Sequence, residues 1–246
     1  MMYSPLEQFE MRTLMTMNNS SMMSMTNYLV YLMLVLGMMS LYYNMMSESK
    51  MKSTRWGLSM LSMYDTVLNM VRSQVGPRGE MYFPFMFSLF NFILIANLMS
   101  MMPYSFAMSA QMVGMMALSL TLWLGLTMLG LNAHGLNFFS LFVPTGTPLA
   151  LVPVLVLIET LSYSSKALSL GLRLSANIMA GHTLTLILGS LILGLMGSSL
   201  LGLILGFIPL TGVIAIVMTE FAISCIQAYV FCILFSGYLK DAMYLH

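Results

Sequence analysis

The architecture of this chain follows from residues 149–182, which read LALVPVLVLIETLSYSSKALSLGLRLSANIMAGH. They open an almost uninterrupted apolar stretch that extends to Gly237. The charged or imidazole side chains within this stretch are Glu159, Lys166, Arg173, His182 and Glu220. Since one transmembrane helix needs about 20 apolar residues, a run of this length predicts at least two long helices that cross a membrane.

The composition of the whole chain is typical of a membrane protein. Hydrophobic residues make up 59% of it, charged residues only 7%, and the mean hydropathy is +0.88. A soluble domain carries about a quarter charged residues, so this chain has too few to cover a water-facing surface. The net charge of +1 argues against a nucleic-acid partner, which would require a clustered basic surface.

Hydrophobic periodicity divides residues 1–246 into the parts of a single membrane domain. Residues 133–148, which contain two prolines and two glycines, are expected to form a loop. The predicted parts are an N-terminal segment (1–27), a first span (28–43), an amphipathic surface helix (53–73), second and third spans (83–102 and 112–131), and a hairpin of two long helices (149–197 and 202–239). The expected fold is therefore all-α, with five membrane-crossing helices and one surface helix.

The surface helix differs from the spans because its apolar and polar side chains occupy opposite sides. Met60, Met63 and Val67 recur at spacings of three and four residues, and Asp65 and Arg72 lie on the other side. Such a helix lies in the membrane interface and does not cross the membrane.

The charges around this helix predict the orientation of the chain. Residues 44–80 contain five Lys and Arg residues, and positively charged segments favour the inner side of a membrane. The N-terminus is then expected outside. After five crossings, the C-terminus is expected inside.

The two long helices predict which polar residues lie at the same depth. In an antiparallel hairpin, residues at equal depth have numbers with a constant sum. Three polar pairs centre on residue 200 or 201 in this way: Glu159 with Asp241, Arg173 with Gln227, and His182 with Glu220. Along a helix, Glu159 would lie about 21 Å from Arg173, and His182 about 13.5 Å from it on the other side. The distance from Glu159 to His182 covers the ~30 Å apolar thickness of a bilayer. By the same rule, Lys166 has only Leu234 opposite it.

Arg173 is expected to separate two proton paths. A guanidinium keeps its proton and is costly at lipid depth, so its presence there indicates a functional site. Carboxylates and imidazoles exchange protons, which predicts one half-channel at Glu159 and Asp241 and another at His182 and Glu220. Two half-channels separated by a permanent positive charge need a moving carrier, such as a carboxylate on a partner protein.

Six stretches of the chain carry a resemblance to a known family. They read SPLEQFE (4–10), ANLMSMMPYSFAMSA (96–110), FFSLFVPTGTP (138–148), PLALVPVLVLIETLSY (148–163), SLGLRLSANIMAGH (169–182) and YLKDAMYLH (238–246). They resemble subunit a of the rotary ATP synthase in its fungal mitochondrial form, and the resemblance covers essentially the whole chain. It implies steeply tilted last helices against the c-ring. It also implies a mitochondrial inner-membrane location with the N-terminus in the intermembrane space and the C-terminus in the matrix, and a leader remnant at Met1–Tyr3.

The resemblance also implies a role for each polar residue. Arg173 is similar to the essential arginine that faces the carboxylate of the rotor ring. Glu159 and Asp241 resemble residues of the matrix half-channel, and His182 and Glu220 resemble those of the intermembrane-space half-channel. Gln227 matches a position near the arginine, and Asn177 matches a polar neighbour of it. Lys166 stands where many fungal relatives have a second arginine. Lysine keeps the charge of that arginine but not its bidentate binding of carboxylates.

The expected function is that of a stator subunit that delivers protons to and from the c-ring and so drives rotation for ATP synthesis. The expected partners are the c-ring, the peripheral-stalk subunit b, small membrane subunits and membrane lipid. We expect no enzymatic activity in this chain, because it lacks the G-x-x-x-x-G-K-[ST] loop that binds nucleotide phosphates. We also expect no metal and no cofactor, since protons are the transported species.

Two other classes of membrane protein fit the sequence less well. A secondary transporter usually shows internal inverted repeats and broken helices at mid-membrane, and no such duplication is visible. An intramembrane serine hydrolase would pair a serine with a histidine such as His182, but a G-x-S-x-G elbow is absent. Co-migration with a ring of small two-helix subunits would separate the stator from both alternatives.

Overall fold

The computed structural model describes residues 9–16, 24–47, 55–102, 105–143, 148, 151–197, 202 and 206–244. The expected leader remnant at Met1–Tyr3 lies outside these residues. So does most of the expected turn of the hairpin, residues 198–201.

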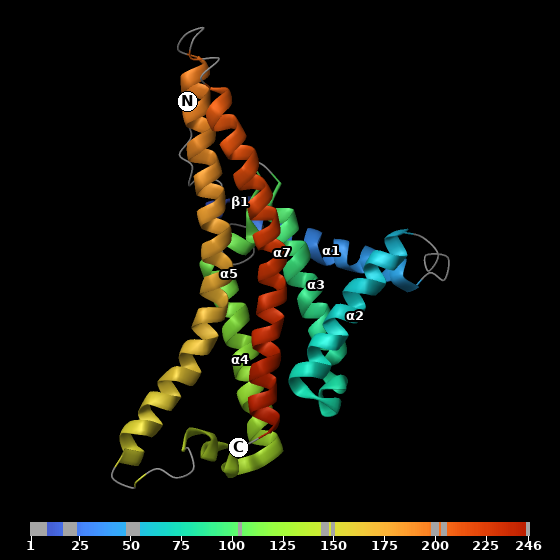
Figure 1. Ribbon diagram of the computed structural model, residues 1–246, viewed down its shortest axis with the longest axis vertical. Helices are drawn as coiled ribbons and strands as arrows, with labels where there is room; N and C mark the ends of the chain where they lie inside the picture. The colour runs from blue at the N-terminus through green and yellow to red at the C-terminus, as the bar shows by residue number, and fades with distance from the viewer. Residues whose placement is uncertain are drawn as a thin grey trace. The chain divides into compact units, whose positions relative to one another are not determined.

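The described chain is dominated by long helices (Figure 1). The α-helices are α1 (Asn27–Ser47), α2 (Arg55–Val75), α3 (Phe83–Ser100), α4 (Met112–His134), α5 (Val152–Met196) and α7 (Phe207–Met243). Three 3₁₀ helices lie between them: η4 (Pro77–Tyr82), η5 (Met108–Ala110) and η6 (Gly135–Phe142). Within the described ranges, five helices (α1, α3, α4, α5 and α7) are long and apolar enough to cross a membrane, α3 and α4 each together with an adjacent 3₁₀ helix. This result confirms the helical membrane fold.

Helix α2 is the amphipathic one. Val67, Met70 and Val71 are buried on one side of it, while Arg72 and Asp65 are exposed. The helix ends at Val75 because Gly76 has a φ of +80°, a conformation that glycine adopts without strain, and because Pro77 begins η4.

A short β-hairpin is an addition to the all-α expectation. Strand β1 (Thr13–Thr16) pairs antiparallel with β2 (Ser24–Thr26). The amide of Asn27 also donates a hydrogen bond of 3.1 Å to the carbonyl of Arg12, which continues the pairing to the start of α1. Three or four residues are too few to give a recognisable alternation in the sequence.

The segment expected to be a loop at 133–148 is largely the 3₁₀ helix η6. Its Phe138 lies directly against Gly130 of α4, where any side chain larger than hydrogen would overlap the ring. Phe138, Phe142 and Tyr163 form a buried aromatic cluster. Packing of these rings stabilises a helical turn that the glycines and prolines of the sequence did not indicate.

The chain forms two compact units. The first contains α1, α3 from Asn91 onward, α5 from Leu174 onward and α7 as far as Ala228. Within it, α5 runs antiparallel beside α7, orange beside red in Figure 1. The second unit contains α2, the start of α3, α4, η6, α5 through Arg173 and α7 from Tyr229 onward. Within it, the ring of Tyr64 contacts that of Phe83, with centroids 4.8 Å apart, and the ring of Phe85 contacts that of Phe235, at 5.9 Å.

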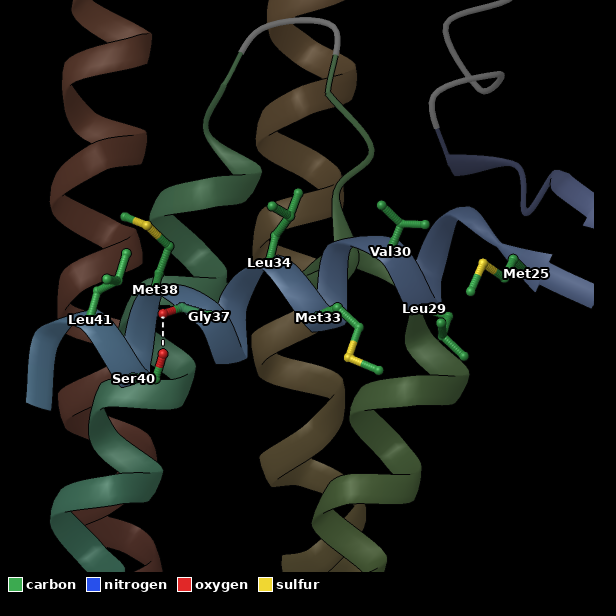
Figure 2. A pocket seen from close by; sticks show the side chains of 9 residues that line it. All are labelled: Met25, Leu29, Val30, Met33, Leu34, Gly37, Met38, Ser40 and Leu41. Carbon is green, nitrogen blue, oxygen red and sulfur yellow. Dashed lines mark hydrogen bonds between the residues drawn. The ribbon is translucent and has the colours of Figure 1, made fainter. Parts of the chain in front are cut away.

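One face of α1 forms a shallow apolar groove of about 630 Å³ (Figure 2). Its lining residues are Met25, Leu29, Val30, Met33, Leu34, Gly37, Met38, Ser40 and Leu41. The Ser40 hydroxyl donates a hydrogen bond of 2.7 Å to the carbonyl of Gly37, so the polar group in the lining is satisfied within the helix. The groove contains no titratable side chain and is not the functional site.

Gly171 allows α5 to approach α4 closely. A Cβ atom at this position would lie 2.6 Å from the Ser119 hydroxyl and 2.9 Å from the carbonyl oxygen of Met115. Backbone atoms cannot move aside as a flexible side chain does, so this contact requires glycine.

We predict that Gly171→Ala lowers the thermal stability of the purified protein, because overpacking costs about 1–3 kcal/mol. Gly189→Ala is the matched control: it lies on the same helix and meets nothing within 4 Å. The control should be neutral or stabilising, since alanine favours a helix by about 1 kcal/mol over glycine. Equal melting temperatures for the two variants would contradict the prediction.

Candidate functional site

Arg173 lies on the exposed face of α5. Ser169, Ala176 and Ala180 share this face at spacings of three to seven residues and are exposed as well. Their small side chains leave the guanidinium accessible to a closely approaching surface. Within the described residues Arg173 forms no ion pair.

In the first unit, His182 and Glu220 lie at the same level of α5 and α7. A Cβ atom on Gly181 would be 2.8 Å from the carboxyl carbon of Glu220, so the carboxyl group packs against the α5 backbone next to His182. His182 is 9% exposed. Its Nε2 atom and the Oε1 atom of Glu220 are buried and have no hydrogen-bond partner in the part of the chain that is described.

Helix α3 adds a third wall to this cluster. Asn97 is fully buried, and its Nδ2 donates a hydrogen bond of 3.1 Å to the carbonyl of Ser224, one turn beyond Glu220 on α7. The Ser100 hydroxyl donates to the Asn97 carbonyl at 2.7 Å, and the Ser100 backbone lies near the ring of His182. The Oδ1 atom of Asn97 is a further buried atom without a described partner.

Three polar atoms from three helices therefore lie buried and unpaired in one contact network: Asn97 Oδ1, His182 Nε2 and Glu220 Oε1. A buried polar group without a partner is costly, and native proteins satisfy such groups with water or ligands. We define Asn97, Ser100, His182 and Glu220 as the first polar cluster.

The sequence analysis missed Asn97 and Ser100. A signal was present, because Asn91 and Asn97 are amide side chains within an otherwise apolar predicted span, and polar groups in membrane spans are usually functional.

The second unit holds the other polar cluster, formed by Tyr163, Lys166, Tyr238 and Asp241. The Lys166 Nζ lies 3.7 Å from Asp241 Oδ2, with side chains 34% and 39% exposed. The same Nζ lies 6.0 Å from the ring centre of Tyr163 and 5.5 Å from that of Tyr238. Contacts of this kind hold a cation over aromatic rings.

This pairing corrects the constant-sum expectation, which placed Glu159 opposite Asp241 and found only Leu234 opposite Lys166. The rule assumes helices that stay side by side. In Figure 1 the yellow start of α5 lies apart from the red end of α7, so residues with a constant sum of numbers need not face each other there. No described ion pair or hydrogen bond involves the side chain of Glu159, a half-buried residue of α5.

The remaining predicted residues lie on the same two helices. Asn177 is exposed on α5, one turn beyond Arg173, and Gln227 is half-buried on α7. Among the described residues there is no group of three or more His, Cys, Asp and Glu side chains that could hold a metal ion. Cys225 and Cys232 are unpaired thiols.

The arrangement suits the transfer of protons more than a bond-breaking reaction. Each polar cluster combines a carboxylate with other groups that donate or accept hydrogen bonds, which are the components of a proton path. Arg173 carries a charge that no proton transfer removes.

Comparison with known proteins gives consistent similarities over the whole chain. The family described as ATP synthase A chain matches residues 24–240. ATP synthase subunit a of Debaryomyces hansenii is 61% identical over 246 residues, and that of Candida parapsilosis is 57% identical over 246 residues, with 100% of both chains covered in each case. Subunit a of Saccharomyces cerevisiae is 51% identical over 249 residues, covering 99% of this chain and 96% of the relative.

We predict that Lys166 and Asp241 stabilise each other. In a double-mutant cycle of Lys166→Met and Asp241→Asn, the coupling free energy should be about 0.2–1 kcal/mol, the range measured for partly exposed pairs. Thermal unfolding of the purified assembly is the measurement, and Glu159→Gln replaces Asp241→Asn in the control cycle. A coupling to Glu159 as large as that to Asp241 would contradict the pairing.

Proposed function

The chain belongs to the ATP synthase A chain family and is the proton-channel stator subunit of the membrane sector. From this premise we propose that it conducts protons through two offset half-channels separated by Arg173. The observation that carries the proposal is the position of Arg173 on an exposed, small-residue face of α5. The positive charge of Arg173 is costly in lipid. A carboxylate of a partner protein that contacts the guanidinium would compensate this cost.

The first polar cluster is assigned to the half-channel on the intermembrane-space side. His182 and Glu220 exchange protons. Asn97, whose Nδ2 donates to the Ser224 carbonyl on α7, contributes its buried Oδ1 as an acceptor in the same half-channel. Water bound to the three unpaired atoms would satisfy them and at the same time connect them.

The second polar cluster is assigned to the half-channel on the matrix side, together with Glu159. Asp241 is the proton-exchanging carboxylate. Lys166 orients it through their ion pair and is itself held between two tyrosine rings.

Arg173 is assigned the separation of the two half-channels. A carboxylate of the rotor ring would be neutral while it faces lipid and ionised beside the guanidinium, because an adjacent opposite charge favours the charged form. Asn177 and Gln227 are assigned as polar neighbours that keep this level hydrated. One proton crossing the membrane potential supplies ~2.3 kcal/mol per 100 mV, so several protons per turn drive rotation.

The chain is embedded in a membrane and assembles with other ATP synthase subunits. We propose that these partners are the c-ring, the peripheral-stalk subunit b and small membrane subunits. We place the complex in the mitochondrial inner membrane, with steeply tilted last helices, the N-terminus in the intermembrane space and the C-terminus in the matrix. The chain itself would catalyse no reaction and bind no cofactor, since nucleotide chemistry belongs to other subunits.

We predict that Arg173→Ala abolishes proton-driven ATP synthesis in assembled complexes, because the two half-channels lose the charge that separates them. ATP synthesis in inner-membrane vesicles is the measurement. Arg72→Ala is the control, since Arg72 is an exposed arginine of the surface helix that pairs with Glu80 at 2.8 Å. Normal coupled synthesis by the assembled Arg173→Ala complex would refute the proposal.

We predict that Asn97→Leu slows proton-driven synthesis about fivefold, the effect of losing a hydrogen bond worth ~1 kcal/mol, while assembly persists. Asn91→Leu is the matched control, because Asn91 is an equally buried asparagine of α3 with no described contact to the first polar cluster. If both variants reduced the rate equally, Asn97 would have a structural role only.

A further inference from the structure

Phe9 covers one side of His182. The two rings have centroids 6.4 Å apart and planes at 76°, which is the edge-to-face arrangement that aromatic rings favour. A phenyl ring neither donates nor accepts a conventional hydrogen bond, so this side of the imidazole is closed to water.

Phe9 is held in this position by several independent contacts. Its ring packs on the buried cluster of Ala107, Ala110 and Ile178. Its carbonyl oxygen accepts a hydrogen bond from the Gln111 side chain. The segment that follows Phe9 continues into β1, which pairs with β2 at the start of α1.

The contacts of His182 differ on its other sides. The Ser100 backbone lies near the ring, the Glu220 carboxyl packs next to Gly181, and the Nε2 atom is buried without a described partner. The other groups of the first polar cluster therefore come from α3 and α7, whereas Phe9 comes from the N-terminal segment.

We propose that Phe9, held by Gln111, is a fixed cover that confines proton access to His182 to the side lined by Glu220 and Asn97. The proposal rests on the half-channel assigned above and adds a positioning residue from the N-terminal segment. Without the cover, water would reach the imidazole from a second direction, and the first polar cluster would lose its defined path.

The accessibility of His182 tests the cover directly. Diethyl pyrocarbonate acylates accessible imidazoles, and peptide mass spectrometry of the complete purified ATP synthase resolves the rate at each histidine. Phe9→Ala should raise the rate at His182 about tenfold, since an edge-to-face aromatic pair alone contributes on the order of a factor of ten. Gln111→Leu should raise it in the same direction, and Phe9→Tyr, which keeps the ring, should leave it unchanged.

Two controls distinguish the loss of the Phe9 cover over His182 from a general loosening of the folded protein. His134 lies in the other unit, where its Nε2 is 3.0 Å from the carbonyl oxygen of Met243, and its rate should not change in any variant. Phe92→Ala removes an equally half-buried phenylalanine of the first unit and should leave the rate at His182 unchanged.

An unchanged rate at His182 in Phe9→Ala and Gln111→Leu would overturn the proposal, and so would an equal rise in Phe92→Ala. If Phe9→Ala does not assemble, Phe9→Leu should give an intermediate rise, and no rise there counts against the cover. ATP synthesis by His182→Ala complexes is measured separately. Normal synthesis in them would refute the half-channel while leaving the cover intact, so the two failures are distinguishable.

Discussion

A guanidinium that keeps its proton in an apolar helix is the constraint on which the other features depend. Arg173 cannot become neutral, and the proposed function requires a partner that brings a negative charge to its helix face. The exposed Ala176 and Ala180 meet this requirement because small side chains allow close approach. A membrane protein without such a partner would gain nothing from placing the charge there. The chain belongs to the ATP synthase A chain family, and the c-ring is the partner that we propose for this face.

Close helix packing supports the chemistry on both sides of this charge. Gly181 allows the Glu220 carboxyl to lie against the α5 backbone, and Gly171 allows α4 to contact α5 near Arg173. In the first unit, the missing side chain of Gly181 leaves room for the carboxyl group of Glu220. Helix association in membranes depends on such contacts because lipid provides little hydrophobic driving force between helices. Positions that pack closely are therefore also positions that hold polar side chains precisely.

Particular residues show which parts of the candidate site could be predicted from the sequence. Charged residues in apolar runs were recognisable at once, because their cost in lipid is large. Asn97 was overlooked since an amide costs less than a charge, and its side chain binds the Ser224 carbonyl, which is distant in the sequence. Lys166 was left without a counterpart because its ion pair with Asp241 depends on how the helices diverge. The N-terminal cover depends on a contact between Phe9 and His182, residues that share no local pattern.

The sequence by itself determined the membrane class of this protein, its long helices, its amphipathic surface helix and its family. All of these follow from hydrophobicity and motifs, which are properties of one segment at a time. Only the tertiary structure decided which polar groups meet: Asn97 with α7, Lys166 with Asp241, and Phe9 with His182. The physical reason is that a contact between distant segments depends on helix spacing, divergence and side-chain reach, and none of these is encoded by the periodicity of either segment alone.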